Sequence, residues 1–137
     1  MILVDTGPLV GLFDPRDGAH PSCARTLASI REELVTTVPV LTEAFHLLDP
    51  GSRGAAALRE FVQASGVRLW FMTDASLARA FELMHRYADH PMDLADASLV
   101  VAAEATRATT VFTLDKKDFA TYRARIGRSW RRLTLLG

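Results

Sequence analysis

Two aspartates open the most apolar helical segment of the chain. Between residues 94 and 105 only three side chains are polar, so this helix is predicted to be buried on most sides. Asp93 suits the N-cap position, where a carboxylate accepts hydrogen bonds from free backbone amides. Asp96 could simply complement the helix dipole, but a carboxylate carried into the interior must be paired, protonated or bound to a cation. These two acids are the first candidates for a reactive site.

Three other acids occupy comparable positions. Asp5 and Asp115 each follow a short apolar segment that is typical of a buried strand, and Glu43 lies on a largely apolar helical segment. In parallel α/β sheets the strands end, and the following helices begin, at the same edge of the sheet. A single acid at such a position is usually a cap or turn residue, as we expect for Asp118. Four acids predicted at one edge, namely Asp5, Glu43, Asp96 and Asp115, indicate a site.

Four carboxylates at one edge need a counter-charge. Two like charges in contact repel by ~4 kcal/mol at an effective dielectric constant of about 20, so the cluster favours a divalent cation. Ligands that offer only oxygen favour Mg²⁺ or Mn²⁺ over zinc. Such ions activate water and stabilise the charge on a phosphodiester during hydrolysis. The pattern predicts metal-assisted phosphodiester hydrolysis.

The elements that must position these acids alternate along the chain. Short β-branched or apolar segments predict strands at residues 2–4, 35–38, 67–72, 109–114 and 133–135. Helical segments are predicted at residues 9–13, 19–33, 39–48, 53–64, 75–87, 93–105 and 119–125, with Asp74 as the cap of the fifth. This alternation predicts an α/β fold with a mostly parallel sheet and helices on both faces.

Composition limits the architecture and the compartment. The chain has 137 residues, 49% hydrophobic and 23% charged, which predicts one domain over residues 1–137 with a substantial core. No apolar stretch is long enough for a membrane span, and no basic leader precedes the first apolar run. The single Cys23 excludes an internal disulfide, and the histidines lack zinc-ligand spacing. We expect a cytoplasmic protein.

The net charge of zero hides a strong segregation. The first 115 residues carry nine Lys and Arg against fifteen Asp and Glu, whereas residues 116–137 carry seven against one. Any single basic residue is most simply a solvated surface charge, but the cluster is a candidate contact for a phosphate backbone. Its members are Lys116, Lys117, Arg123, Arg125, Arg128, Arg131 and Arg132.

Taken together, four motifs resemble the PIN domain, and within that family the VapC-type toxins of bacterial toxin-antitoxin pairs. They are Val4-Asp5-Thr6, Glu43, Asp93-Leu-Ala-Asp96-Ala-Ser-Leu and Thr113-Leu-Asp115-Lys-Lys-Asp118-Phe, and they span nearly the whole chain. The resemblance implies a central parallel sheet of five strands in the order 3-2-1-4-5.

The resemblance also implies an activity. It implies an endoribonuclease that depends on Mg²⁺ or Mn²⁺, cleaves single-stranded or looped RNA, forms a homodimer and pairs with a small antitoxin protein. Asp5, Glu43, Asp96 and Asp115 fall on the acidic quartet of the family. Asp93 and Asp118 are additional acids beside it, and Thr6 and Thr113 match its small hydroxyl positions.

Other classes fit less well. A haloacid-dehalogenase-like phosphatase requires an acid two residues after Asp5, where this chain has Gly7. A phosphoreceiver domain requires a phosphorylatable Asp after the third strand and a Lys after the fifth, and neither is evident. A non-catalytic RNA-binding or protein-interaction domain on the same fold remains the alternative, because fold alone does not define function.

Overall fold

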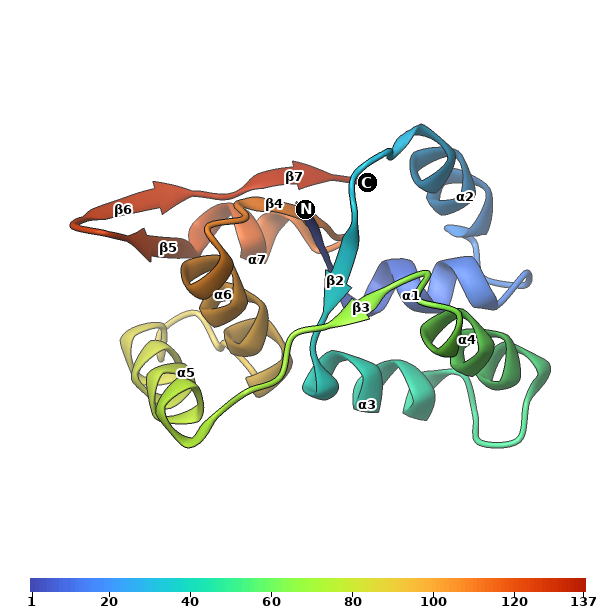
Figure 1. The fold of residues 1–137 in the computed structure, drawn as a ribbon, viewed down its shortest axis with the longest axis horizontal. Coiled ribbons are helices and arrows are strands. Elements are labelled where there is room, and N and C mark those ends of the chain that lie inside the picture. The colour runs from blue at the N-terminus through green and yellow to red at the C-terminus, as the bar shows by residue number, and fades with distance from the viewer.

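The computed structural model describes residues 1–137 and is built around one parallel sheet (Figure 1). Its strands are β1 (Ile2–Val4), β2 (Leu34–Thr36), β3 (Arg68–Leu69), β4 (Thr110–Phe112) and β7 (Thr134–Leu136). They lie in the order β3-β2-β1-β4-β7, and all neighbours are parallel. The expected order is confirmed, since β7 is the fifth strand of this sheet. The central β1 is buried along its whole length, which explains its run of apolar residues without alternation.

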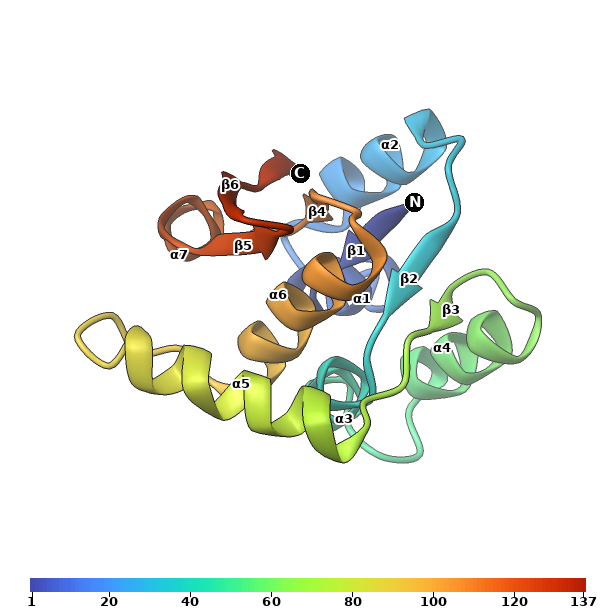
Figure 2. The same cartoon turned by 60° about the vertical axis from the view of Figure 1, so that its left-hand side comes forward.

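Seven helices connect and cover the strands. They are α1 (Thr6–Phe13), α2 (His20–Ser29), α3 (Val38–Leu47), α4 (Arg53–Gln63), α5 (Asp74–Arg86), α6 (Leu94–Thr106) and α7 (Lys116–Thr121). In Figure 1, α5, α6 and α7 lie to the left of β1 and β2, and α1, α2 and α4 lie to the right. Figure 2 shows α6 crossing in front of β1 with α5 outside it. Helices thus cover both faces of the sheet.

Helix α6 is the central helix of the core. Eight of its residues, Ala95 and Ala97 to Ala103, are buried, and it contacts β1, α3 and α5. Alanine and serine dominate this run, so neighbouring elements approach closely. Burial on nearly every side matches the prediction from its composition.

Side-chain caps explain where several helices begin. Asp93 is the N-cap of α6 and accepts a 2.8 Å hydrogen bond from the Asp96 amide. Thr37 caps α3, so that helix begins at Val38 and shortens the strand expected at residues 35–38 to Leu34–Thr36. The prediction that Asp74 caps α5 is wrong. Thr73 is the cap, in a reciprocal pair with Ser76.

The C-terminal part of the chain differs most from expectation. The helix predicted at residues 119–125 is wrong, because α7 ends at Thr121 and an antiparallel hairpin follows, β5 (Arg123–Ile126) and β6 (Ser129–Arg132). Gly127, with a φ of 62°, begins its two-residue turn. Figure 1 shows the hairpin projecting from the sheet on the side of α5 to α7, with β6 running on into β7. The third strand also has only two residues, within the predicted 67–72.

Within this fold, no helix is both long and apolar enough to cross a membrane.

Candidate active site

Six carboxylates surround one cleft at the carboxyl end of the central strands. The cleft has a volume of about 500 Å³. The acids that line it are the four candidates Asp5, Glu43, Asp96 and Asp115 and the two additional acids Asp93 and Asp118. Thr6, Gly7, Leu47, Pro91 and Leu114 complete the lining. The fold therefore brings together acids that lie 113 positions apart in the sequence, from Asp5 to Asp118.

Strand ends and helix starts deliver these acids. Asp5 follows β1 and is the residue before α1, and its backbone amide donates to the Phe112 carbonyl of β4 at 2.9 Å. Asp115 is the N-cap of α7 and accepts from the Asp118 amide at 3.2 Å. Asp96 lies in the first turn of α6. Because β1 and β4 are parallel neighbours, Asp5 and Asp115 leave the sheet at the same edge.

Thr113 connects two of the carboxylates. Its fully buried hydroxyl donates to Asp5 Oδ2 at 2.8 Å and accepts from the Asp115 amide at 2.9 Å. One hydroxyl thus orients the Asp5 carboxylate and the backbone that carries Asp115. This is a positioning role, and it fits the small hydroxyl residue expected at this position.

Burial and repulsion between carboxylates raise the pKa of two acids. Burial, opposed by the Thr113 hydrogen bond and reinforced by Glu43 and Asp115, raises the pKa of Asp5 to about 6. Burial and the charges of Asp93 and Asp5 raise the pKa of Asp96 to about 7. A cation bound in the cleft would favour the ionised forms of both acids.

The outer acids differ in their surroundings. Burial, together with the charge of Asp93, raises the pKa of Glu43. Burial also raises the pKa of Asp115, whereas hydrogen bonds from Asp115 and His90 lower the pKa of Asp118. His90 Nε2 lies 2.5 Å from Asp118 Oδ1.

The sequence alone did not identify two residues at this site. The hydroxyl of Tyr122, a fully buried side chain, donates to Asp96 Oδ2 at 3.2 Å. The His90 ring stands edge-on to the Tyr122 ring, with centroids 5.9 Å apart. Neither residue belongs to a local motif. Their roles depend on contacts between segments distant in the sequence.

The oxygen donors of the cleft fit a hard divalent cation, but the carboxylates lie too far apart to bind one without moving. As they stand, no three His, Cys, Asp or Glu side chains are close enough to hold a metal ion together. Thr6 Oγ1, in the wall of the cleft, is the one buried side-chain polar atom with no hydrogen-bond partner. A buried hydroxyl without a partner is costly, so this atom suits a ligand or water bound in the cleft. The carboxylates must draw together around an ion, which their mutual repulsion opposes without it.

The basic residues lie outside the cleft lining. Lys116 and Lys117 are exposed at the start of α7, beside Asp115. The five arginines of the C-terminal cluster lie on the hairpin, where Arg125, Arg128, Arg131 and Arg132 are exposed. Arg123 differs, because its Nη1 donates to the carbonyls of Ala120, Thr121 and Tyr122 at 2.7–3.0 Å. Its guanidinium thus satisfies carbonyl groups at the carboxyl end of α7.

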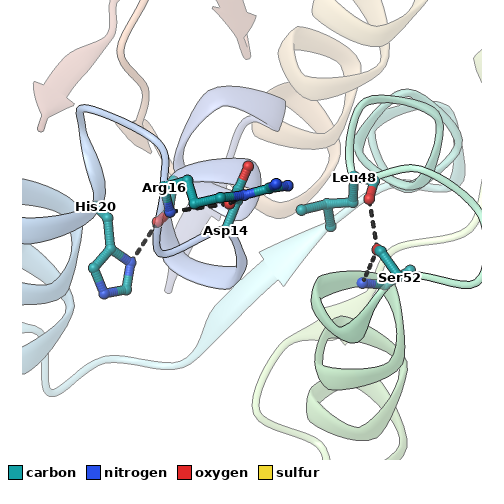
Figure 3. A network of polar contacts seen from close by, with 7 residues as sticks. Asp14, Arg16, His20, Leu48 and Ser52 are labelled. Carbon is teal, nitrogen blue, oxygen red and sulfur yellow. Dashed lines mark hydrogen bonds and ion pairs between the residues drawn. The ribbon is translucent and has the colours of Figure 1, made fainter.

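A second cleft, of about 570 Å³, lies between the ends of α1 and α3 and the start of α4. Figure 3 shows the polar contacts around it: Asp14 pairs with Arg16, and Ser52 caps α4 while donating to the Leu48 carbonyl. Asp14 is its only acid, and most of its exposed surface is apolar. This cleft lacks the groups that hydrolysis requires.

Fold and site together define a small α/β protein with an acidic cluster at the carboxyl edge of a parallel sheet. The model of the PIN domain matches residues 2–124. The chain belongs to the PIN-domain family.

Several known proteins resemble the chain over most of its length. Ribonuclease VapC26 of Mycobacterium tuberculosis is 26% identical over 125 residues, which cover 89% of this chain and 92% of the relative. The crystal structure of VapC20 of M. tuberculosis, described as a toxin that cleaves the Sarcin-Ricin loop, superposes with a TM-score of 0.81 at 22% identity, covering 96% of this chain and 100% of that chain.

A further solved structure agrees in fold. VapBC2 from Rickettsia felis, bound to a DNA fragment from its promoter, gives a TM-score of 0.65 at 16% identity and covers 99% of this chain and 98% of that chain. At these identities the two structures establish the shared fold.

Proposed function

We propose that this protein is a metal-dependent endoribonuclease, the toxin of a toxin-antitoxin pair, that hydrolyses phosphodiester bonds of single-stranded or looped RNA. The observation that carries the proposal is the convergence of Asp5, Glu43, Asp96 and Asp115 on one cleft in a PIN-domain chain. The relative VapC26 is a ribonuclease by name, and VapC20 is described as a toxin that cleaves the Sarcin-Ricin loop. Both support this reaction class.

The cofactor in this proposal is Mg²⁺ or Mn²⁺. All donors in the cleft are oxygens, which suits these ions better than softer ones. Asp5, Asp96 and Asp115 would hold the ion, with Asp93 and Asp118 at its margin. Bound there, the ion would supply Lewis-acid chemistry to the attacking water and the phosphate.

The remaining roles fall to residues of the chain. Glu43 either joins the ligands or orients the attacking water. Thr113 holds Asp5 and Asp115 in register through its two hydrogen bonds. Thr6 has a buried hydroxyl without a well-formed hydrogen bond, close enough to Glu43 to oppose the rise in the pKa of that acid, and it could orient a ligand or water.

Unpaired RNA is the substrate form that this cleft suits. The acids lie at an edge of a compact domain, and a flexible strand can bend its backbone into such a site. A stiff duplex would bring more uncompensated phosphate charge against the six carboxylates.

The partners in this proposal are a small antitoxin, whose tail would occupy the acidic cleft, and a second copy of the chain. The similar structure VapBC2 is a complex bound to DNA, which supports an antitoxin partner. Purification as a stable monomer that binds no protein encoded beside it would count heavily against both partners.

Incubation of the purified protein with a structured RNA pool tests the activity. We expect cuts with Mn²⁺ that disappear with EDTA and in Asp5→Asn. Tight RNA binding without cuts under every condition would instead favour the non-catalytic domain.

A further inference from the structure

The β5–β6 hairpin presents arginines and one tryptophan on a shared face. In this antiparallel pair Arg123 lies opposite Arg132, and Arg125 lies opposite Trp130. Opposite residues project to the same side and sides alternate along each strand, so these four side chains share one face. Ala124, on the other face, is fully buried.

The charges on this hairpin are not neutralised within the protein. None of its arginines forms an ion pair with a carboxylate, whereas Arg79 of α5 is paired with both Glu82 and Glu104. Arg123 is held by the carbonyls of α7. Arg125 and Arg132 therefore remain free to bind an anion.

Trp130 adds an aromatic surface to this cationic face. The residue is 38% exposed, so part of its surface faces solvent. Two guanidinium groups of α5 lie over its ring, Arg86 at 4.3 Å and Arg79 at 5.7 Å from the centroid, and Arg86 forms no ion pair. Arginines beside an exposed aromatic ring form the combination that binds single-stranded nucleic acid, in which bases stack and phosphates pair with cations.

The hairpin starts one residue after a side chain that contacts an acid of the cleft. Tyr122, which donates to Asp96, directly precedes β5. At about 3.3 Å per residue, the pair of Arg125 and Trp130 lies roughly 10 Å along the strand from Tyr122. A strand of RNA that enters the cleft can therefore continue onto this face within a few nucleotides.

We infer that the face formed by Arg125, Trp130, Arg132 and Arg86 is a docking track for the single-stranded segment that flanks the cleaved bond. One base stacks on Trp130, and backbone phosphates contact the arginines. The track supplies the attraction for RNA that the acidic cleft lacks. The inference rests on the proposed function, which identifies RNA as the ligand. Its test therefore measures RNA binding under conditions without cleavage.

The test uses Trp130 itself as the reporter. Trp70 is the only other tryptophan, so Trp70→Phe leaves Trp130 as the sole source of tryptophan emission. In EDTA, we expect a short oligouridylate to quench this emission saturably. In an RNA-binding assay that does not use tryptophan emission, Trp130→Leu should weaken affinity by about tenfold or more, whereas Trp130→Phe retains most of it because a ring that stacks remains.

Arginine variants test the phosphate contacts. Arg125→Gln and Arg132→Gln should each lower the salt slope of binding by about 0.7. Arg53→Gln, at the start of α4 and outside the track, should leave the slope unchanged.

Several outcomes would overturn the track. Equal affinities for Trp130→Leu and Trp130→Phe would exclude stacking, and an unchanged salt slope in both arginine variants would exclude the phosphate contacts. If the Trp130 emission changes with protein concentration and not with RNA, this face is an interface between two copies of the chain and not an RNA-binding surface. Cleavage in Mn²⁺ without quenching would refute the track alone, whereas quenching without cleavage in Mn²⁺ would refute the proposed function and leave the track.

Discussion

At the scale of single residues, the acidic cleft is built at a cost to stability. Asp5 is only 6% exposed and receives a single hydroxyl hydrogen bond at its carboxylate, from Thr113. Asp96 lies between Asp93 and the Tyr122 hydroxyl. Both groups have raised pKa values because burial and neighbouring carboxylates disfavour their charged forms. Such strain at one cluster is typical of sites that serve function.

The first prediction concerns Asp5→Asn in metal-free buffer. The folded pKa of Asp5 is about 6, above its usual value of 3.8, so its contribution to stability is complete below pH ~4 and is lost as pH rises through the folded pKa. Asparagine does not ionise, so the variant does not lose this stability as pH rises. At pH 8 the variant should be more stable by up to about 3 kcal/mol, and at pH 4 the gain should vanish. Urea unfolding in EDTA measures the free energy of unfolding of the variant and of the unsubstituted protein at each pH. Equal values for the two proteins at pH 8 would contradict an unfavourable buried charge at Asp5.

The second prediction concerns Tyr122→Phe, which removes the hydroxyl that donates to Asp96. Without this bond the Asp96 carboxylate is less well oriented, and Mn²⁺ affinity should fall about tenfold. Tyr87→Phe is the matched control, because the Tyr87 hydroxyl accepts from the Arg123 amide and does not touch the acids. Calorimetric titration compares the two. Equal affinities would remove Tyr122 from the support of the site.

At the scale of elements, the sequence predicts best where one local pattern decides the structure. The apolar run Ile2–Val4 identifies β1, and the nearly uninterrupted apolar segment after Asp93 identifies α6, so the acids that end or open these elements could be placed at one edge. The hairpin was missed because half of its strand residues are arginine and its apolar side consists of Ala124 and Ile126 alone, although Gly127 and Arg128 supply a two-residue turn. The Tyr122 contact with Asp96 could not be predicted, since it depends on how the start of the hairpin packs against α6.

The third prediction concerns the attachment of the hairpin to α5 and α6. Glu104 of α6, with its side chain 12% exposed, pairs with Arg79 through both carboxylate oxygens and accepts from the Arg125 amide at 2.6 Å. Glu104→Gln should lower the free energy of unfolding by about 2 kcal/mol. Glu82→Gln, whose side chain is 68% exposed, should change it by less than about 0.5 kcal/mol. Urea unfolding compares the two variants, and a Glu104 variant as stable as the Glu82 variant would refute this anchoring role.

At the scale of the whole molecule, the fold places an acidic surface and a basic surface apart, although their charges cancel in the net charge. The net charge is zero, yet six acids line one cleft while the free arginines gather on the hairpin beside it. A phosphate backbone is attracted by the second surface and repelled by the first unless a cation is bound there. RNA binding and metal binding should therefore reinforce each other in this protein.

The most direct measurement is a Mn²⁺ titration in which RNA cleavage and metal binding are read on the same protein. Half-saturation of binding and half-maximal cleavage should occur at the same Mn²⁺ concentration. Asp96→Asn should weaken binding by at least about tenfold and abolish most cleavage, whereas Asp89→Asn, an exposed acid outside the cleft, should leave both unchanged. Cleavage by Asp96→Asn with the Mn²⁺ dependence of the unsubstituted protein would contradict the assignment of hydrolysis to the acidic cleft.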